Sequence, residues 1–234
     1  MRQKWLLSMW LVLTAAAAFA SQVLAADNEL TAQEKQAGWI LLFDGTSTKD
    51  WMTSEWQLCP QAVENGSINP DKCNTYMMTY ERLWTDFVLV LDFKISAHTN
   101  SGIFVRTFPL KPLPGFDVGY NGIEVQILDS HTAGFYDTGA LYDLVKPTRN
   151  AMRPVGEWNH VQITCSKSII DVNLNGEHVN HMDLDQWTRP YERPDGTPHK
   201  FNTAFKYHPR TGYLGLQKHG GNAWFKNIKL KPLD

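Results

Sequence analysis

Strict alternation of apolar and other side chains from Phe87 to Ile95 constrains the fold of this chain more than any other feature. Successive side chains of a strand point to opposite faces, so this segment predicts a long strand with one buried face. No segment has a helical period over any length. One short helix is expected near residues 31–37, where Thr31 and Glu34 have the spacing of a capping box. The pattern therefore predicts an all-β protein.

Further strands follow in quick succession along the chain. Asn175-Gly176 has the composition of a type I′ turn and predicts a tight connection into a short strand at His178. Many short strands separated by Gly and Asn turns predict one antiparallel sandwich or barrel domain. The other expected strands are residues 39–43, 75–79, 102–107, 123–128, 159–165, 169–174, 213–218 and 223–230.

Residues 1–25 have the features of a cleavable signal peptide. A basic start at Arg2 and Lys4 precedes an uncharged apolar run, and Val23-Leu24-Ala25 fits a small-residue cleavage site. The run is short and rich in alanine, which argues against a membrane span. No Cys lies near the cleavage site, so we expect no lipid anchor. Residues 26–234 are then expected to form one domain that is periplasmic or secreted.

Charge and cysteine content narrow the class further. Without Arg2 and Lys4, the chain has 20 basic and 24 acidic residues, a net charge of −4. This balance argues against nucleic-acid and anionic-membrane partners. Cys59 and Cys73 flank a turn-rich loop and are expected to form a disulfide in an exported protein. Cys165 is in phase with the apolar residues of its strand and is expected to be a buried thiol.

Large polar side chains occur in the interior of three predicted strands. Glu124 and Gln126 alternate with Ile123, Val125 and Ile127. A carboxylate in mid-strand is costly unless it is paired or faces a wet cleft. The same reasoning assigns polar faces to the strands around residues 100–106 and 215–219. If the three strands are neighbours, they form one pocket, and the alternative is a plain solvated face. The shared face would hold Asn100, Gly102, Phe104, Arg106, Glu124, Gln126, Gln217 and His219.

Two connections are long, residues 129–157 and residues 180–211. Long ordered connections are usually functional, and the aromatic residues of 180–211 argue against disorder. Two interpretations of residues 180–211 remain open, a lid over a cleft and a structural insertion.

The chain resembles the 3-keto-disaccharide hydrolase domain family. The matching segments occur in family order and span nearly all of residues 26–234. They are Trp39–Gly45 with Trp51, Asp86-Phe87, Asp92–Lys94, Asn100–Arg106, Gly122–Asp129, Gly139–Tyr142, Gly156–Asn159, Asn175-Gly176, Gly215–Gly220 and Phe225–Ile228. The resemblance implies a concanavalin-like jelly roll of two antiparallel sheets. Lys218 and the long 180–211 segment depart from the family pattern, which concerns specificity more than fold.

The resemblance also implies an enzyme that cleaves glycosides already oxidised at C3. A 3-keto group acidifies the hydrogen on C2, so a base can start β-elimination of the C1 substituent, and water then adds back. We expect Glu124 to act as the base. Arg106 or a bound metal would stabilise the enediolate, and His219 would protonate the leaving oxygen or serve as the alternative base. The expected substrate-binding residues are Asn100, Gln126, Asp129, Tyr142 and Gln217.

No cofactor is certain from the sequence. A divalent metal is one option for polarising the 3-keto oxygen, with Glu124, His131 and His219 as candidate ligands. The alternative is that His131 is a loop residue without a role. The expected partner is a small carbohydrate, and a sugar 3-dehydrogenase could act beside the enzyme.

Two other functions remain open. Glu124, Gln126 and Asp129 have the spacing of the Glu-x-Asp-x-x-Glu strand of laminarinase-type glycosidases, but two of the three residues differ from that pattern. A conventional retaining mechanism would need two carboxyl groups ~5–5.5 Å apart. The third possibility is a non-catalytic carbohydrate-binding domain, because fold alone does not settle function.

Overall fold

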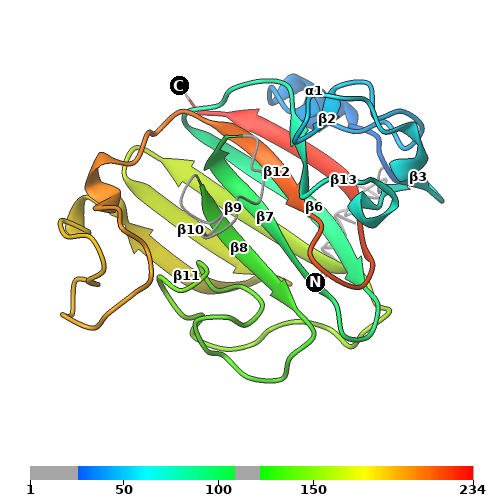
Figure 1. The fold of residues 1–234 in the computed structure, drawn as a ribbon. Coiled ribbons are helices and arrows are strands. Elements are labelled where there is room, and N and C mark those ends of the chain that lie inside the picture. Colours follow the sequence, from blue (N-terminus) through cyan, green and yellow to red (C-terminus); the bar gives the residue numbers. More distant parts are fainter. Residues whose placement is uncertain (1–25, 109–121, 234) are drawn as a thin grey trace, which may run out of the picture.

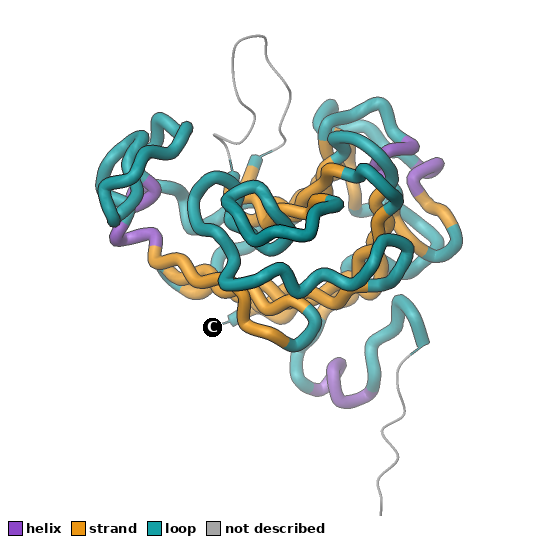
Figure 2. Tube along the Cα trace, turned by 90° about the horizontal axis from the view of Figure 1, so that it is seen from below, coloured by secondary structure: helices purple, strands orange, loops and turns teal. Residues whose placement is uncertain are grey.

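The computed structural model describes residues 26–108 and 122–233, and the predicted signal peptide lies outside them. The described chain folds into thirteen strands in two antiparallel sheets, which confirms the predicted all-β jelly roll. Figure 1 looks onto the smaller sheet, with its strands in front of those of the larger sheet. Figure 2 shows the two layers from below, with loops around them. Within the described residues, no helix is long and apolar enough to cross a membrane.

The larger sheet has eight strands. Its strands follow one another in the order β11 (Glu177–Asp183), β10 (Ile169–Leu174), β9 (Asn159–Ser166), β6 (Phe87–Ile95), β13 (Ala223–Pro232), β4 (Ser67–Ile68) and β3 (Val63–Glu64), while β1 (Ile40–Leu41) also pairs with β13. The turn between β10 and β11 has φ of +53° at Asn175 and +86° at Gly176. These values are those of the predicted type I′ turn.

The smaller sheet has five strands. Their order is β2 (Trp51–Thr53), β5 (Met77–Tyr80), β12 (Tyr213–Gln217), β7 (Asn100–Thr107) and β8 (Ile123–Leu128). The three strands predicted to share a polar face are therefore consecutive neighbours. The prediction of a common pocket required these three strands to be neighbours, and they are.

The core lies between the two sheets. Alternate residues of β6 from Phe87 to Ile95 are buried, and the residues between them are partly exposed. Ile103 of β7 and Val125 of β8 belong to the same continuous apolar cluster. The alternation in the sequence thus assigned the inner face of both sheets correctly, and the other face of β7 and β8 points away from the core.

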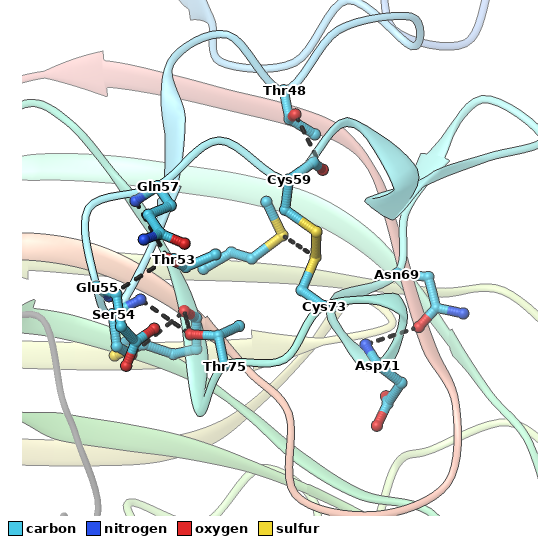
Figure 3. The surroundings of a disulfide bond; sticks show 12 residues. Thr48, Thr53, Ser54, Glu55, Gln57, Cys59, Asn69, Asp71, Cys73 and Thr75 are labelled. Atoms are coloured by element: carbon cyan, nitrogen blue, oxygen red, sulfur yellow. Dashed lines mark hydrogen bonds between the residues drawn. A yellow bond between two sulfur atoms is a disulfide. The ribbon is translucent and has the colours of Figure 1, made fainter.

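Local signals outside the sheets also agree with the sequence. The only α-helix of the described residues, α1 (Ala32–Gln36), starts with the Thr31–Glu34 capping box. Cys59 and Cys73 form a disulfide that joins two 3₁₀ turns, η1 (Pro60–Ala62) and η2 (Pro70–Lys72), as Figure 3 shows. Cys165 is a fully buried free thiol, and burial raises its pKa to about 12.

The 184–212 segment is part of the sandwich and not a separate flap. It runs from β11 at the edge of the larger sheet to β12 in the smaller one, through η4 (Leu184–Gln186) and η5 (Phe205–Tyr207). Trp187, Phe201 and Phe205 are buried in the main core. Since these rings are occupied by packing, the structural interpretation of the segment is favoured over the lid.

A buried ion pair fastens this segment to the loop after β8. Arg193 donates to the side chain of Asp143 at 3.0 Å and to its backbone carbonyl at 2.7 Å. Asp143 also accepts from the Tyr136 hydroxyl at 3.1 Å and from the Lys200 N–H at 2.8 Å. Asp143 and Arg193 are both less than a tenth exposed. We refer to Tyr136, Asp143, Arg193 and Lys200 as the Asp143–Arg193 clasp.

Candidate active site

The outer face of the five-stranded sheet carries two rows of side chains that cross β5, β12, β7 and β8. Glu124 pairs with Phe104, which pairs with Gly215, which pairs with Thr79. Directly paired residues of an antiparallel sheet project to the same face. This first row therefore places Glu124 directly beside Phe104, with Gly215 and Thr79 further along the row.

The second row lies one pair further along the same strands. Gln126 pairs with Gly102, and the pairing of Leu216 with Ile103 sets Gln217 opposite Gly102 from the other side. Gln217 in turn pairs with Met77 of β5. The two rows together bring Glu124, Gln126 and Gln217 onto one surface, as the sequence predicted.

Gly102 makes room for the Glu124 side chain. A Cβ added at Gly102 would overlap Glu124 Oε1 and would lie 2.7 Å from its Cγ and 2.8 Å from its Cδ. Real Cβ atoms do not approach neighbours this closely, so only glycine fits here without displacing the acid. Glu124 itself is 7% exposed. The carboxylate is thus held over β7 in a defined and nearly enclosed position.

Two amides beside Glu124 leave their carbonyl oxygens without partners. Gln126 Nε2 donates to Asn100 Oδ1 at 3.2 Å, and Gln217 Nε2 donates to the Tyr76 hydroxyl at 2.6 Å. Each amide is therefore oriented by its nitrogen. Gln126 Oε1 and Gln217 Oε1 are buried and accept no hydrogen bond in the described structure. Buried oxygens of this kind are rare and call for an explanation, and a ligand that donates hydroxyl hydrogens supplies one.

An apolar floor that the sequence analysis missed accompanies these amides. Met77 and Phe104 form a small cluster of their own, separate from the main core, and Tyr76 packs against it. Alternation places Phe104 on the polar face, but the sequence did not show that β5 lies two strands away, with only β12 between it and β7. The only sequence signal for this floor was the Tyr76-Met77 pair in a predicted strand. The sequence did not indicate which strands lie near that one in the sheet.

Tyr142 borders the face beyond β8. Its backbone N–H donates to Glu124 O at 2.9 Å, and Leu141 forms a bridge with Val125. Leu141 is in the core, and Tyr142 is partly buried and packs against the same cluster. The Lys200 ammonium lies 4.1 Å from the centre of the Tyr142 ring. The role of Tyr142 in substrate binding stays a prediction.

The prediction that Arg106 shares this face is wrong. Thr107 pairs with Tyr213 and Phe104 with Gly215, so two residues of β7 stand against the single Leu214. This bulge, with φ of +50° at Arg106, shifts the alternation of side chains.

The Arg106 side chain instead reaches the larger sheet. It is fully buried, and its Nη2 donates to Asp86 Oδ1 at 3.1 Å and to Thr85 O at 3.2 Å. Burial lowers the pKa of its guanidinium. Asp86 precedes β6, so Arg106 ties the two sheets together and does not accompany Glu124 on the outer face.

His219 lies at one end of the polar face. β12 ends at Gln217, and His219 follows in an exposed bend. Gly220 pairs with Asn100 through two backbone hydrogen bonds of 2.8 and 3.1 Å. This pairing keeps the His219 backbone near Asn100, at one end of the second row. Strand alternation had instead placed His219 inside the strand, on the same face as Gln217.

Asp129 is held by the loop before β7. Its Oδ2 accepts from His98 N–H at 2.8 Å, just beyond the end of β8. The pairing of β7 with β8 is regular from Asn100 to Val105, without a bulge. Five residues of regular strand separate Glu124 from Asp129 by roughly 16 Å between Cα atoms. This separation disagrees with a laminarinase-type acid pair, while a role of Asp129 in sugar binding stays a prediction.

The proposed metal ligands do not form a group. Glu124, His131 and His219 are not among the sets of His, Cys, Asp and Glu side chains whose ligand atoms lie within 4.8 Å of one another, within the part of the chain that is described. His131 is exposed and lines a separate cavity of about 520 Å³ with Asp129 and Arg153. No step of a mechanism is therefore assigned to a metal at Glu124.

Comparison with known proteins agrees with this geometry. A family model described as a 3-keto-alpha-glucoside-1,2-lyase-like domain matches residues 38–231. The chain belongs to this family. It is 26% identical to a 3-keto-disaccharide hydrolase of Bacteroides thetaiotaomicron over 229 residues, which cover 84% of this chain and 79% of that protein. The resemblance stated from the sequence motifs is thereby confirmed.

Solved structures show the same fold. Two candidate glycosyl hydrolases from Parabacteroides distasonis superpose with TM-scores of 0.72 and 0.67, at 24% and 29% identity. The matches cover 89% and 83% of this chain, and 100% and 99% of those chains. The comparisons thus support a function as a carbohydrate hydrolase, on the fold predicted from the strand pattern.

Proposed function

We propose that this protein cleaves 3-keto-glycosides, including 3-keto-disaccharides, by elimination and rehydration on the outer face of the five-stranded sheet. Membership of the 3-keto-alpha-glucoside-1,2-lyase-like family and the similarity to a named 3-keto-disaccharide hydrolase support the substrate class. The observation that carries the proposal is the enclosed Glu124 carboxylate beside two buried amide oxygens that lack donors among the described residues.

Glu124 acts as the base in this mechanism. It removes the proton from C2, which the neighbouring 3-keto group has acidified, and the electron pair forms an enediolate. The C1–O bond then breaks, and the leaving oxygen takes a proton. Water adds across the resulting double bond, which gives the free 3-keto sugar and the released aglycone. The net reaction is hydrolysis without a change of oxidation state.

The neighbouring side chains hold the sugar. Gln126 Oε1 and Gln217 Oε1 accept hydrogen bonds from sugar hydroxyls, and Asn100 and Tyr76 fix the two amides through their nitrogens. His219, at the Asn100 end of the face, protonates the leaving oxygen or serves as the alternative base. Because Gln126 and Gln217 flank Gly102, the sugar lies across β7 next to Glu124.

The test compares a β-glucoside with its 3-keto derivative. Purified protein is incubated with each, and released aglycone is measured over time. We expect release from the keto form alone. Release from both compounds would favour a conventional two-carboxylate glycosidase, and binding without release would favour a carbohydrate-binding domain. A Glu157→Gln variant, altered at an exposed acid, is the control for handling and is expected to match the wild type.

Export and pathway position complete the proposal. The basic and apolar pattern of residues 1–25 supports export to the periplasm or the medium. A 3-keto-glycoside must be made by oxidation of a glycoside at C3, so a sugar 3-dehydrogenase is the class of enzyme that supplies the substrate. Cell fractionation tests the location: recovery of an unprocessed chain in the cytoplasm would contradict export.

A further inference from the structure

A second group of chemically versatile side chains lies on the outer face of the other sheet. Asp171 of β10 pairs with His181 of β11, and His178 lies three residues earlier on β11. Asp171 Oδ1 lies 2.8 Å from His181 Nδ1 and 2.9 Å from His178 Nε2. The three potential ligand atoms all lie within 4.8 Å of one another. The two histidines are about half exposed, so the group faces solvent.

A β-bulge creates this group. Residues three apart on a regular strand point to opposite faces, so His178 and His181 would normally be separated by the sheet. Here Val172 pairs with Asn180 but Asn173 pairs with His178, which leaves Val179 as an extra residue. The inserted residue turns His178 to the face of His181, while Val179 points into the core.

The distances within the group suit a metal ion. Metal–nitrogen bonds to zinc are about 2.1 Å long, and ligands at that distance lie about 3 Å apart in an octahedral site and about 3.4 Å apart in a tetrahedral one. The two nitrogen–oxygen distances, 2.8 and 2.9 Å, are close to the octahedral value and somewhat shorter than the tetrahedral one. Two imidazoles and one carboxylate on one side leave the remaining positions open to water, as in two-histidine, one-carboxylate sites.

We propose that Asp171, His178 and His181 bind a divalent transition-metal ion such as Zn²⁺ or Ni²⁺. The group occupies the sheet opposite to Glu124, so the ion stabilises the β10–β11 edge and does not take part in sugar cleavage. Imidazole and carboxylate donors favour these ions over Ca²⁺ and Mg²⁺, which prefer all-oxygen sites. Thiols do not compete, because Cys165 is buried and the other two cysteines form the disulfide.

The same face offers a matched control. His160 Nδ1 lies 2.7 Å from Asp92 Oδ1, and His160 is as exposed as His178 and His181. This pair has one imidazole instead of two. It therefore has the same kind of hydrogen bond as the proposed site but offers only two potential metal ligands instead of three.

The experiment titrates Zn²⁺ and Ni²⁺ into the purified protein, freed of any affinity tag, by isothermal calorimetry. We expect one ion per chain, and an increase in Kd of more than about tenfold in His178→Gln and His181→Gln, since even outer-shell partners of metal ligands have effects of that size. His160→Gln is expected to bind like the wild type. Circular dichroism confirms that each variant is folded.

A thermal melt gives a second measurement. Zn²⁺ is expected to raise the Tm of the wild type and of His160→Gln, and to leave the Tm of His181→Gln unchanged, because only a bound ion stabilises the folded state. Absence of binding in the wild type at millimolar metal would overturn the proposal. Equal affinity in the wild type and in both site variants would also overturn it.

Discussion

The polar face around Glu124 and the Asp143–Arg193 clasp both bury charged and amide groups, but they treat them differently. In the clasp, both Asp143 carboxylate oxygens accept hydrogen bonds, and Arg193 reaches Asp143, Leu144 O and Pro198 O. On the polar face, Gln126 Oε1 and Gln217 Oε1 accept none from residues 26–108 and 122–233. The clasp is complete without a ligand, whereas the polar face is oriented but unfilled.

This difference separates a structural network from a binding surface. Burying a polar oxygen without a donor costs roughly 1–3 kcal/mol, so a fold does not retain such groups without a reason. A substrate whose hydroxyls supply the missing donors regains that cost on binding. We therefore expect substitutions on the polar face to change activity and those in the clasp to change stability.

The largest effect is expected from Glu124→Gln. The amide keeps the size of the side chain but cannot take the C2 proton, so kcat should fall by about 10²–10⁴-fold. The Tm should change little. Steady-state release of aglycone from a 3-keto-glucoside and a thermal melt measure the two quantities. An unfolded variant would identify Glu124 as a structural residue and would remove the contrast with the clasp.

Asp143→Ala should show the opposite behaviour. It leaves the Arg193 guanidinium buried without its carboxylate, which costs about 3–5 kcal/mol of unfolding free energy. Urea unfolding measures the loss. Asp185→Ala is the control, because its partner Arg210 forms an ion pair in which Asp185 is exposed, and such pairs contribute about 0–1 kcal/mol. Similar losses in both variants would contradict the structural role of the clasp.

Gly102→Ala tests whether the position of Glu124 matters. The added methyl group overlaps the carboxylate and must displace it, and a shift of about 1 Å can reduce a rate by about 10²-fold. Gly220→Ala is the matched control, because a Cβ there meets nothing within 4 Å. Full activity of the Gly102 variant would show that the site does not depend on this close approach.

Gln217→Met should mainly weaken substrate binding. The substitution removes the orphaned carbonyl oxygen while keeping the length of the side chain, so a sugar hydroxyl loses its acceptor. We expect KM to rise by about tenfold, which corresponds to 1.4 kcal/mol, and the loss of the Gln217–Tyr76 hydrogen bond to cost about 1 kcal/mol of stability. An unchanged KM with a lower Tm would place Gln217 in the scaffold.

The smallest effect concerns pH and His199, which packs beside the clasp. Burial, followed by the charge of Arg193, lowers the pKa of His199, and its Nδ1 accepts the Phe201 N–H at 3.1 Å. The unfolded chain takes up this proton near pH 6.5, while the folded state does so at lower pH. Stability should therefore fall as the pH decreases below about 6.5, by at most about 1.4 kcal/mol per pH unit from this group.

His199→Asn should remove that component, since the amide oxygen can replace Nδ1 as acceptor and does not titrate. Urea midpoints measured above and below about pH 6.5 for both proteins give the comparison. Equal pH dependence in the wild type and the variant would contradict the assignment.

Most of the fold followed from local patterns in the sequence. Period-two alternation defined β6, and the Asn175-Gly176 turn and the capping box at Thr31 behaved as their residues predict. The short strands β2, β3 and β4 were missed, because segments of two or three residues carry too little alternation. The role of the 184–212 aromatics was also undecided, since composition does not tell a lid from a core segment.

The site was predicted in part. Glu124, Gln126 and Gln217 share a face because β12, β7 and β8 are regular neighbours at these pairs. The prediction for Arg106 failed because a bulge shifted the alternation of side chains. The bulge depends on contact with another strand. Gly212, which approaches the Arg106 backbone so closely that a Cβ would overlap it, belongs to a segment more than a hundred residues away. Such contacts are not visible in the local pattern.

The most direct test of the central claim is a crystal structure of the Glu124→Gln variant with a bound 3-keto-glucoside. The account predicts that the sugar lies across β7, with C2 next to residue 124 and hydroxyls donating to Gln126 Oε1 and Gln217 Oε1. A sugar bound elsewhere, with both amide oxygens still lacking donors, would contradict it.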